Sequence, residues 1–139
     1  MSKITIYFPH VSLDDLAEIR RLIEQSADCL CGSDDAVTEL VFAINEAITN
    51  VLVHGYQGQP GHIVVEVRRD DATLAVCLHD QAQPFNPTAV PTPDTTLPLA
   101  QRQPGGLGVH LMRQFTHQMQ HRVRPEGGNE LKLVKQLES

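Results

Sequence analysis

"DDAVTELVFAINEAITNVLVHGY", residues 34–56, is the longest segment of the chain with helical periodicity, and it decides how the rest can fold. At about 100° per residue, its larger apolar side chains fall on one wide stripe. That stripe consists of Val37, Leu40, Val41, Ile44, Ile48, Val51 and Leu52. A stripe of this width predicts a helix from about 34 to 55 that packs against the core face of a sheet.

Two polar residues of this helix, Glu46 and Asn50, lie nearly opposite the apolar stripe. In most helices such positions face solvent, and spacing alone leaves that alternative open. Their neighbours on the same side are Phe42, Ala43 and Val53, which indicates a second cover over the helix. Four residues apart, Glu46 and Asn50 project side by side. One carboxylate and one amide on the wall of a half-enclosed pocket suit Mg²⁺, which takes one or two protein oxygens and receives the rest from water and phosphate.

The segments on either side of this helix complete a simple order of elements. The pattern predicts strands at about 4–8, 63–67, 74–78, 119–124 and 130–137, and further helices at about 12–32 and 107–118. This order, βααββ-loop-αββ, predicts one α+β domain over residues 1–139. The expected architecture is a two-layer α/β sandwich, in which a mostly antiparallel mixed sheet carries its helices on one face.

Composition sets limits on the partners. The 139 residues carry a formal net charge of −6, and the pI of the sequence is about 5.5. Nucleic-acid and anionic-membrane interfaces are built from clustered Lys and Arg, so we expect no direct contact with nucleic acid or membrane. No signal-peptide core follows Met1, and no window approaches the run of about twenty apolar residues that crosses a bilayer. We therefore expect a cytoplasmic protein.

Residues 79–112 form an unusually long connection that contains six of the nine prolines in the chain. Loops of this length without secondary structure are uncommon in compact domains and are usually functional lids or linkers. Asp80 stands at the start of the connection, and Gly105-Gly106-Leu107-Gly108 leads into the helix at its end. Glycines before a helix expose backbone amides to an anion. A plain hinge would use the same glycines, however, and Asp80 alone could simply form a turn.

Three motifs occur in a specific order along the chain. They are "NEAITNVLVHGY" (45–56), "HDQAQPFNP" (79–87) and "GGLGVHL" (105–111), placed on a helix, a strand end and a helix start. Together they resemble the GHKL ATPase/kinase superfamily, and within it the small anti-sigma-factor serine kinases of bacterial partner-switching systems. The resemblance covers essentially the whole chain. It implies the Bergerat ATP-binding fold, ATP and Mg²⁺ as cofactors, a homodimer, and two partners, a sigma factor and a STAS-type anti-sigma antagonist.

The resemblance also implies roles for individual residues. Asn50 matches an asparagine that binds Mg²⁺ and ATP, and Glu46 matches the neighbouring general base or orienter of the metal shell. Asp80 matches the aspartate that hydrogen-bonds the adenine amino group. The remaining ATP-binding set consists of Ala82, Phe85, Gly105, Gly106, Leu107, Gly108 and Asn129, in which Gly106 and Gly108 close over the phosphates. Residues 86–104 correspond to the ATP lid, and Arg20 to an arginine used in partner recognition.

Two positions depart from the commoner pattern of that family. Ala82 stands where a glycine is frequent, and it adds only a methyl group where the backbone passes the adenine. Gly128-Asn129 replaces a Gly-Thr pair whose threonine contacts the adenine region, and Asn129 can still hydrogen-bond. We therefore expect an ATP- and Mg²⁺-dependent serine kinase that phosphorylates the antagonist and sequesters the sigma factor. The alternative is a nucleotide-binding regulatory module that binds its partner without kinase activity.

Overall fold

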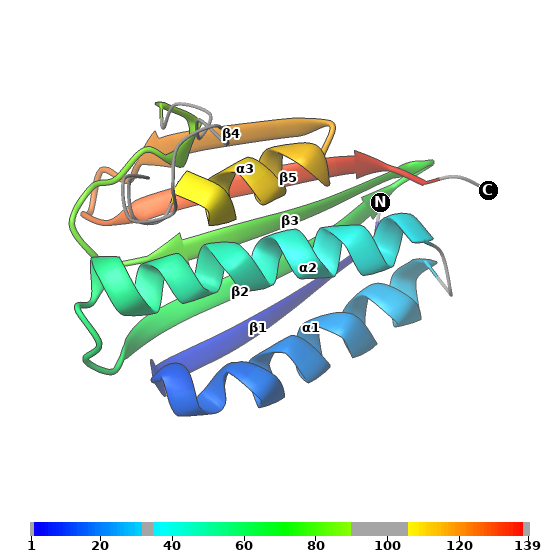
Figure 1. Cartoon of the computed structure of the whole chain (residues 1–139). Coiled ribbons are helices and arrows are strands. Elements are labelled where there is room, and N and C mark those ends of the chain that lie inside the picture. The colour runs from blue at the N-terminus through cyan, green and yellow to red at the C-terminus, as the bar shows by residue number, and fades with distance from the viewer. Residues whose placement is uncertain (1, 32–34, 90–105, 138–139) are drawn as a thin grey trace.

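The computed structural model describes residues 2–31, 35–89 and 106–137, and it shows a sheet with helices packed on one face (Figure 1). The strands are β1 (Ser2–Val11), β2 (Gly61–Asp70), β3 (Thr73–Asp80), β4 (Gln118–Val123) and β5 (Asn129–Gln136). The helices are α1 (Leu16–Cys31), α2 (Asp35–Asn50) and α3 (Gly106–Gln114). Three short helical turns are η1 (Leu13–Asp15), η2 (Val51–Gly55) and η3 (Pro87–Ala89). The strands and main helices follow the order expected from the sequence.

The sheet has the strand order β1-β2-β3-β5-β4. In the described residues all four pairings are antiparallel, so the expected α+β sandwich is confirmed and its sheet is antiparallel rather than mixed. The hairpin between β2 and β3 pairs Asp70 with Thr73. Asp71, in the turn of this hairpin, has a φ of 52°. This value lies in the left-handed region, which aspartate tolerates better than most residues.

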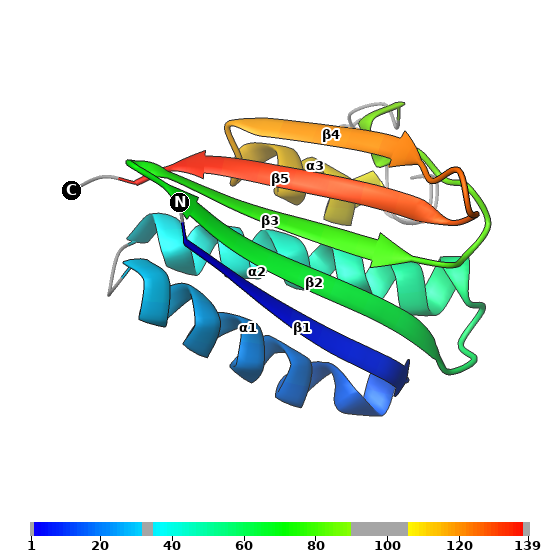
Figure 2. The same cartoon turned by 180° about the vertical axis from the view of Figure 1, so that it is seen from behind.

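The helices lie side by side on one face of the sheet, with α2 in the middle, and the opposite face carries no helix in the described part of the chain (Figure 1 and Figure 2). The apolar stripe of α2 forms the centre of the core, where Leu40, Ile44 and Ile48 are fully buried together with Val65 and Val67 of β2. Full burial of each such side chain stabilises the fold by about 1.5–3 kcal/mol. Since α2 contacts β3, β5 and both other helices, it anchors the layer.

The second cover over α2 is provided by α3. The rings of Phe42 on α2 and Phe115 just after α3 meet edge to face, with their centroids 5.3 Å apart. Ala43 is buried, as expected, but Val53 is 37% exposed, and its place under the second cover was wrongly expected. Val53 lies in η2, a π-helical turn, and the 100° spacing used for the prediction does not hold there.

The helix α3 ends at Gln114, earlier than the expected position near 118. The backbone N–H of His117 donates to the carbonyl of Val134 at 2.8 Å, so the chain has already joined β5 at this point. The hydroxyl of Thr116 donates back to the carbonyl of Met112 at 2.9 Å and occupies one of the last helical acceptors. Pairing with the sheet therefore ends the helix.

The helical segment Asp35–Gly55, which joins α2 and η2, is the one described helix long and apolar enough to cross a membrane, with a mean hydropathy of 1.5 in its best window. No such segment was expected from the sequence. Half of that window is buried inside the fold, where α2 packs on the sheet and between its neighbouring helices. A core helix passes the same test of length and composition, and its place in the core accounts for its apolar character.

Candidate functional site

A pocket opens where the C-terminal end of α2 faces the end of β3 and the start of β5. Five of the residues predicted to bind ATP line it, namely Asn50, Asp80, Ala82, Phe85 and Asn129. They come from three parts of the chain that are well separated in the sequence: the end of α2, the end of β3 with the loop that follows it, and the start of β5. The structure therefore brings the predicted nucleotide contacts into one cavity, with apolar walls supplied by residues such as Val51 and Met112.

Asp80 is a buried carboxylate on the pocket wall. It is the last residue of β3 and is only 2% exposed. Its Oδ1 accepts hydrogen bonds from the N–H of Ala82 at 2.8 Å and from Nδ2 of Asn129 at 3.0 Å. Among the described residues, no group donates to its Oδ2. An acceptor as buried as this favours a ligand that donates a hydrogen bond, because an unmet acceptor is costly.

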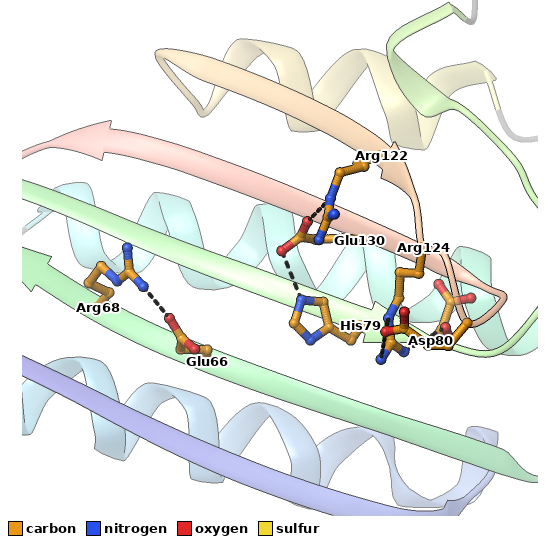
Figure 3. A network of polar contacts seen from close by, with 8 residues as sticks. Glu66, Arg68, His79, Asp80, Arg122, Arg124 and Glu130 are labelled. Atoms are coloured by element: carbon orange, nitrogen blue, oxygen red, sulfur yellow. Dashed lines mark hydrogen bonds and ion pairs between the residues drawn. The ribbon is translucent and has the colours of Figure 1, made fainter.

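Arg124 lies beside Asp80 (Figure 3). Its guanidinium donates a long hydrogen bond of 3.4 Å to the backbone carbonyl of Asp80, and it pairs with Glu126 at 2.8 Å. Further along the open face of the sheet, Glu130 of β5 accepts from His79 at 2.9 Å and from Arg122 at 2.7 Å. The hydrogen bond from His79, followed by that from Arg122, lowers the pKa of Glu130.

Both the nitrogen and the oxygen of the Asn129 side-chain amide form hydrogen bonds with protein groups. Its Nδ2 donates to Oδ1 of Asp80 at 3.0 Å and to the carbonyl of Gln83 at 3.1 Å. Its Oδ1 accepts from the N–H of Phe85 at 2.9 Å and lies 2.7 Å from Nε2 of His121. The residue predicted as an ATP contact thus ties β3, β4, β5 and the loop after β3 into one network around Asp80.

Two glycines permit the close backbone approaches that shape the pocket. Gly128 has a φ of 90°, and a Cβ there would lie 1.9 Å from the carbonyl oxygen of Asp80. Gly55 is the last residue of η2, and a Cβ there would lie 2.8 Å from the Cβ of Ala82. Because Gly55 leaves this space, the methyl group of Ala82 packs onto the end of the helix and is 7% exposed.

Tyr56 joins the end of the helical segment to the sheet. Its hydroxyl donates to the carbonyl of His62 at 2.6 Å and accepts from the N–H of Gln81 at 2.8 Å. Burial is the main cause that raises the pKa of this phenol. The last residue of the motif at 45–56 therefore holds the start of β2 and the loop after β3 in register with the pocket.

Asn50 and Glu46 lie one turn apart on α2, and both are half-buried. Asn50 lines the pocket immediately before the π-helical turn, while Glu46 is not part of the wall. In the described ranges there is no group of three or more His, Cys, Asp or Glu side chains that could hold a metal. One amide oxygen with a carboxylate nearby fits Mg²⁺, which keeps waters and takes phosphate oxygens, better than a metal that needs a full protein cage.

The start of α3 supplies backbone amides on the same helix that contributes Met112 to the pocket. The helix begins at Gly106, and Leu107 and Gly108 lie in its first turn. N–H groups in the first turn of a helix have no partner within the helix and attract anions. Gly105, which was predicted to belong to the same phosphate-binding turn, lies outside the described residues.

Arg113 connects α3 to the segment that precedes the predicted lid. Its guanidinium donates to the carbonyl of Pro87 at 3.1 Å and to that of Thr88 at 2.7 Å. Only residues 86–89 of the predicted lid are described, and 90–104 lie outside the described part of the chain. The start of the lid segment is thus held against α3 at the side of the pocket where Pro87 lies.

Comparison with known proteins places the sequence in a family. The sequence matches the histidine kinase-like ATPase domain family over residues 10–135. The chain belongs to this family. A relative in Bordetella bronchiseptica, named serine/threonine-protein kinase BtrW, is 30% identical over 96 residues, which cover 68% of this chain and 67% of the relative. Anti-sigma F factors of Halalkalibacterium halodurans and Bacillus subtilis are 28% and 26% identical over 106 residues, which cover 74% of this chain and 71% of each relative.

Within this histidine kinase-like ATPase domain, His121, Tyr56 and Gly128 have structural roles that were not predicted from the sequence. The alternation in β4 could have placed His121 on the helix side of the sheet. Only the pairing of β4 with β5, which sets Val123 opposite Asn129, shows that His121 reaches the network around Asp80. The predicted partner residue Arg20 is exposed on α1 and is not among the pocket residues.

Proposed function

We propose that this chain is an ATP- and Mg²⁺-dependent protein serine kinase that binds a sigma factor and phosphorylates a small STAS-type antagonist of the anti-sigma factor. The observation that carries the proposal is the pocket, which Asp80 lines from the sheet and Asn50 from the helix layer. Membership of an ATPase domain family supports ATP as the nucleotide. The names of the relatives support the kinase and anti-sigma roles.

Asp80, Asn50 and the start of α3 have separate roles in this proposal. Asp80 accepts a hydrogen bond from the amino group of adenine, and backbone amides at the start of α3 hold phosphate oxygens. Asn50 offers its amide oxygen to Mg²⁺. A Mg²⁺ ion held there would neutralise negative charge on the phosphates.

Glu46, one helical turn from Asn50, steers the attacking serine hydroxyl of the antagonist and takes up its proton. The serine oxygen forms a bond to the γ-phosphorus while the bond to the oxygen bridging the β- and γ-phosphates breaks. The products are the phosphoserine protein and ADP. Positioning and charge neutralisation, rather than covalent participation of the enzyme, supply the rate enhancement in reactions of this class.

Phosphate transfer from γ-labelled Mg-ATP to the antagonist tests the proposal. Wild type is expected to label the antagonist on serine, and Asn50→Ala should lower the rate about a hundredfold or more because the metal loses its protein ligand. Gln25→Ala, which removes an exposed amide on α1, is the matched control and should keep the wild-type rate. If wild type binds ATP but leaves the antagonist unlabelled, the kinase proposal fails and the regulatory-module alternative stands.

Arg20 is the proposed contact to the sigma factor. It is exposed on α1, whereas the adjacent Arg21 pairs with Glu18 of the same helix. Arg20→Ala should weaken sigma-factor binding about tenfold, as for an arginine central to an interface, while Arg21→Ala should bind as wild type does. Calorimetry with each sigma factor of the source cell measures the affinity of both variants. In a separate experiment, sedimentation velocity tests whether the chain is a homodimer. Equal binding by the two variants would contradict the role of Arg20.

A further inference from the structure

We infer that Asn129, held in place by His121, is a positioning residue that fixes the Asp80 carboxylate for a nucleobase with an exocyclic amino group and does not itself bind the nucleotide. The inference rests on the proposed binding of ATP in this pocket and adds a basis for its selectivity. It concerns a position where this chain departs from the commoner family pattern.

The hydrogen bonds fix the orientation of the Asn129 amide. The carbonyl of Gln83 can only accept, so the group that faces it at 3.1 Å must be the NH₂ of Asn129. The N–H of Phe85 can only donate, so the group that faces it at 2.9 Å must be the amide oxygen. His121 Nε2 lies 2.7 Å from that same oxygen and must therefore carry a hydrogen.

This assignment leaves the amide of Asn129 with nothing to offer a ligand. Both of its donor hydrogens are used, by Asp80 and Gln83, and its oxygen accepts from Phe85 and His121. An amide has two donors and two lone pairs, so its capacity is full. Asn129 is also 6% exposed and lies under the loop that its hydrogen bonds hold.

The same network determines which oxygen of Asp80 can meet a ligand. Both hydrogen bonds to the carboxylate, from Ala82 and from Asn129, end on Oδ1. Oδ2 is thus the acceptor that no described group satisfies, on a residue that lines the pocket. A carboxylate accepts and does not donate, so it selects a base that presents an amino group and disfavours one that presents a carbonyl there.

Binding of ATP and of purine riboside triphosphate, which lacks the 6-amino group, tests the inference by calorimetry in the presence of Mg²⁺. Wild type should bind ATP at least about tenfold more tightly than the analogue, as expected for a hydrogen bond to a charged group. Asn129→Asp places a second carboxylate against Asp80 and should bring the ratio of the two dissociation constants close to one. In this variant the affinity for the analogue should change much less than the affinity for ATP.

His121 provides a second, milder pair of variants. His121→Leu removes the Nε2–H donor and should lower the ratio about threefold, whereas His121→Gln can supply an amide N–H at a similar reach and should keep it. Gln118→Glu on β4 and His10→Leu on β1 make the corresponding amide-to-carboxylate and His-to-Leu changes at exposed positions and serve as controls. Circular dichroism checks that each variant is folded, and the His121 pair keeps the test decisive if Asn129→Asp does not fold.

The ratio of the dissociation constants of ATP and its analogue distinguishes a positioning role from a merely structural one. If Asn129→Asp and His121→Leu weaken ATP and the analogue equally, so that the ratio stays at its wild-type value, the inference is overturned. A wild type that binds ATP without preferring it to the analogue also overturns it and leaves ATP binding intact. A wild type that binds neither nucleotide would overturn the proposed function together with this inference.

Discussion

At the scale of single residues, the pocket depends on Gly128, which has no side chain. Gly128 and Gly127 both have left-handed backbone conformations, with φ values of 90° and 100°. They differ in surroundings, since nothing lies within 4 Å of a Cβ built at Gly127, whereas a Cβ at Gly128 would overlap the carbonyl of Asp80. Gly128 therefore allows the start of β5 to approach the end of β3 closely enough for Asn129 to reach Asp80.

Alanine at these two glycines should cost very different amounts of stability. Gly127→Ala adds only the left-handed strain and should lower the free energy of unfolding by about 1–2 kcal/mol. Gly128→Ala adds an overlap with backbone that only a shift of β3 or β5 can relieve, so we expect a loss of about 3 kcal/mol or more. Urea unfolding followed by circular dichroism measures both. Equal losses for the two variants would show that the contact with Asp80 does not matter.

At the scale of elements, Tyr56 holds three of them together through one hydroxyl. The end of η2, the start of β2 and the loop after β3 meet at hydrogen bonds of 2.6 and 2.8 Å. Burial of the phenol raises its pKa, so the folded state favours the neutral form. A group whose pKa is raised in the folded state contributes its stability below the pKa of the unfolded chain, and this contribution is lost as the pH rises through the folded pKa.

This linkage predicts a loss of stability on the alkaline side. The difference in unfolding free energy between Tyr7→Phe and Tyr7→Phe/Tyr56→Phe should be constant at neutral pH and should shrink above about pH 10. Tyr7, the other tyrosine, is replaced in both proteins so that they differ only in the phenol of Tyr56. Urea unfolding at a series of pH values gives the difference, and an unchanged difference up to pH 11 would contradict the linkage.

At the scale of the whole molecule, the layered arrangement leaves a ligand site at one end of the fold. The helices cover one face of the sheet (Figure 1). Residues of α2, β3, α3, β4 and β5 line the pocket. The lining residues run from Ala47 to Leu131, so nearly two thirds of the chain must be folded before the pocket exists. A ligand of this pocket therefore binds the folded state and stabilises it as a whole.

Thermal unfolding should report this coupling. Mg-ATP at one hundred times its dissociation constant should add about 2.7 kcal/mol to the unfolding free energy and raise the Tm by roughly 8–10 °C. Removal of the metal with EDTA should lower this shift in wild type, and Asn50→Ala should respond much less to EDTA because its metal ligand is missing. Differential scanning calorimetry measures each shift. An unchanged Tm with saturating Mg-ATP would contradict nucleotide binding in the pocket.

Much of the fold was predictable because the signals that carry it are local. Apolar residues at helical spacing in α2 and at alternating positions in β2 and β3 report which side of each element is buried. The predictions that were wrong lie where this spacing breaks, at Val53 in the π-helical turn, or where sheet pairing ends a helix, after Gln114. The local spacing of apolar residues indicates neither the extra residue in the π-helical turn nor the hydrogen bond to Val134.

By itself, the sequence determined the kind and order of the elements, the core side of α2 and the candidates Asn50 and Asp80, because periodicity and motif order are properties of neighbouring residues. Only the tertiary structure shows which groups hydrogen-bond to the amide of Asn129. The pairing of β3 with β5 places Asn129 opposite Asp80, and that of β4 with β5 brings His121 alongside. Hydrogen bonds between residues up to 49 positions apart then use the whole amide, which depends on the register of three strands and not on any local pattern.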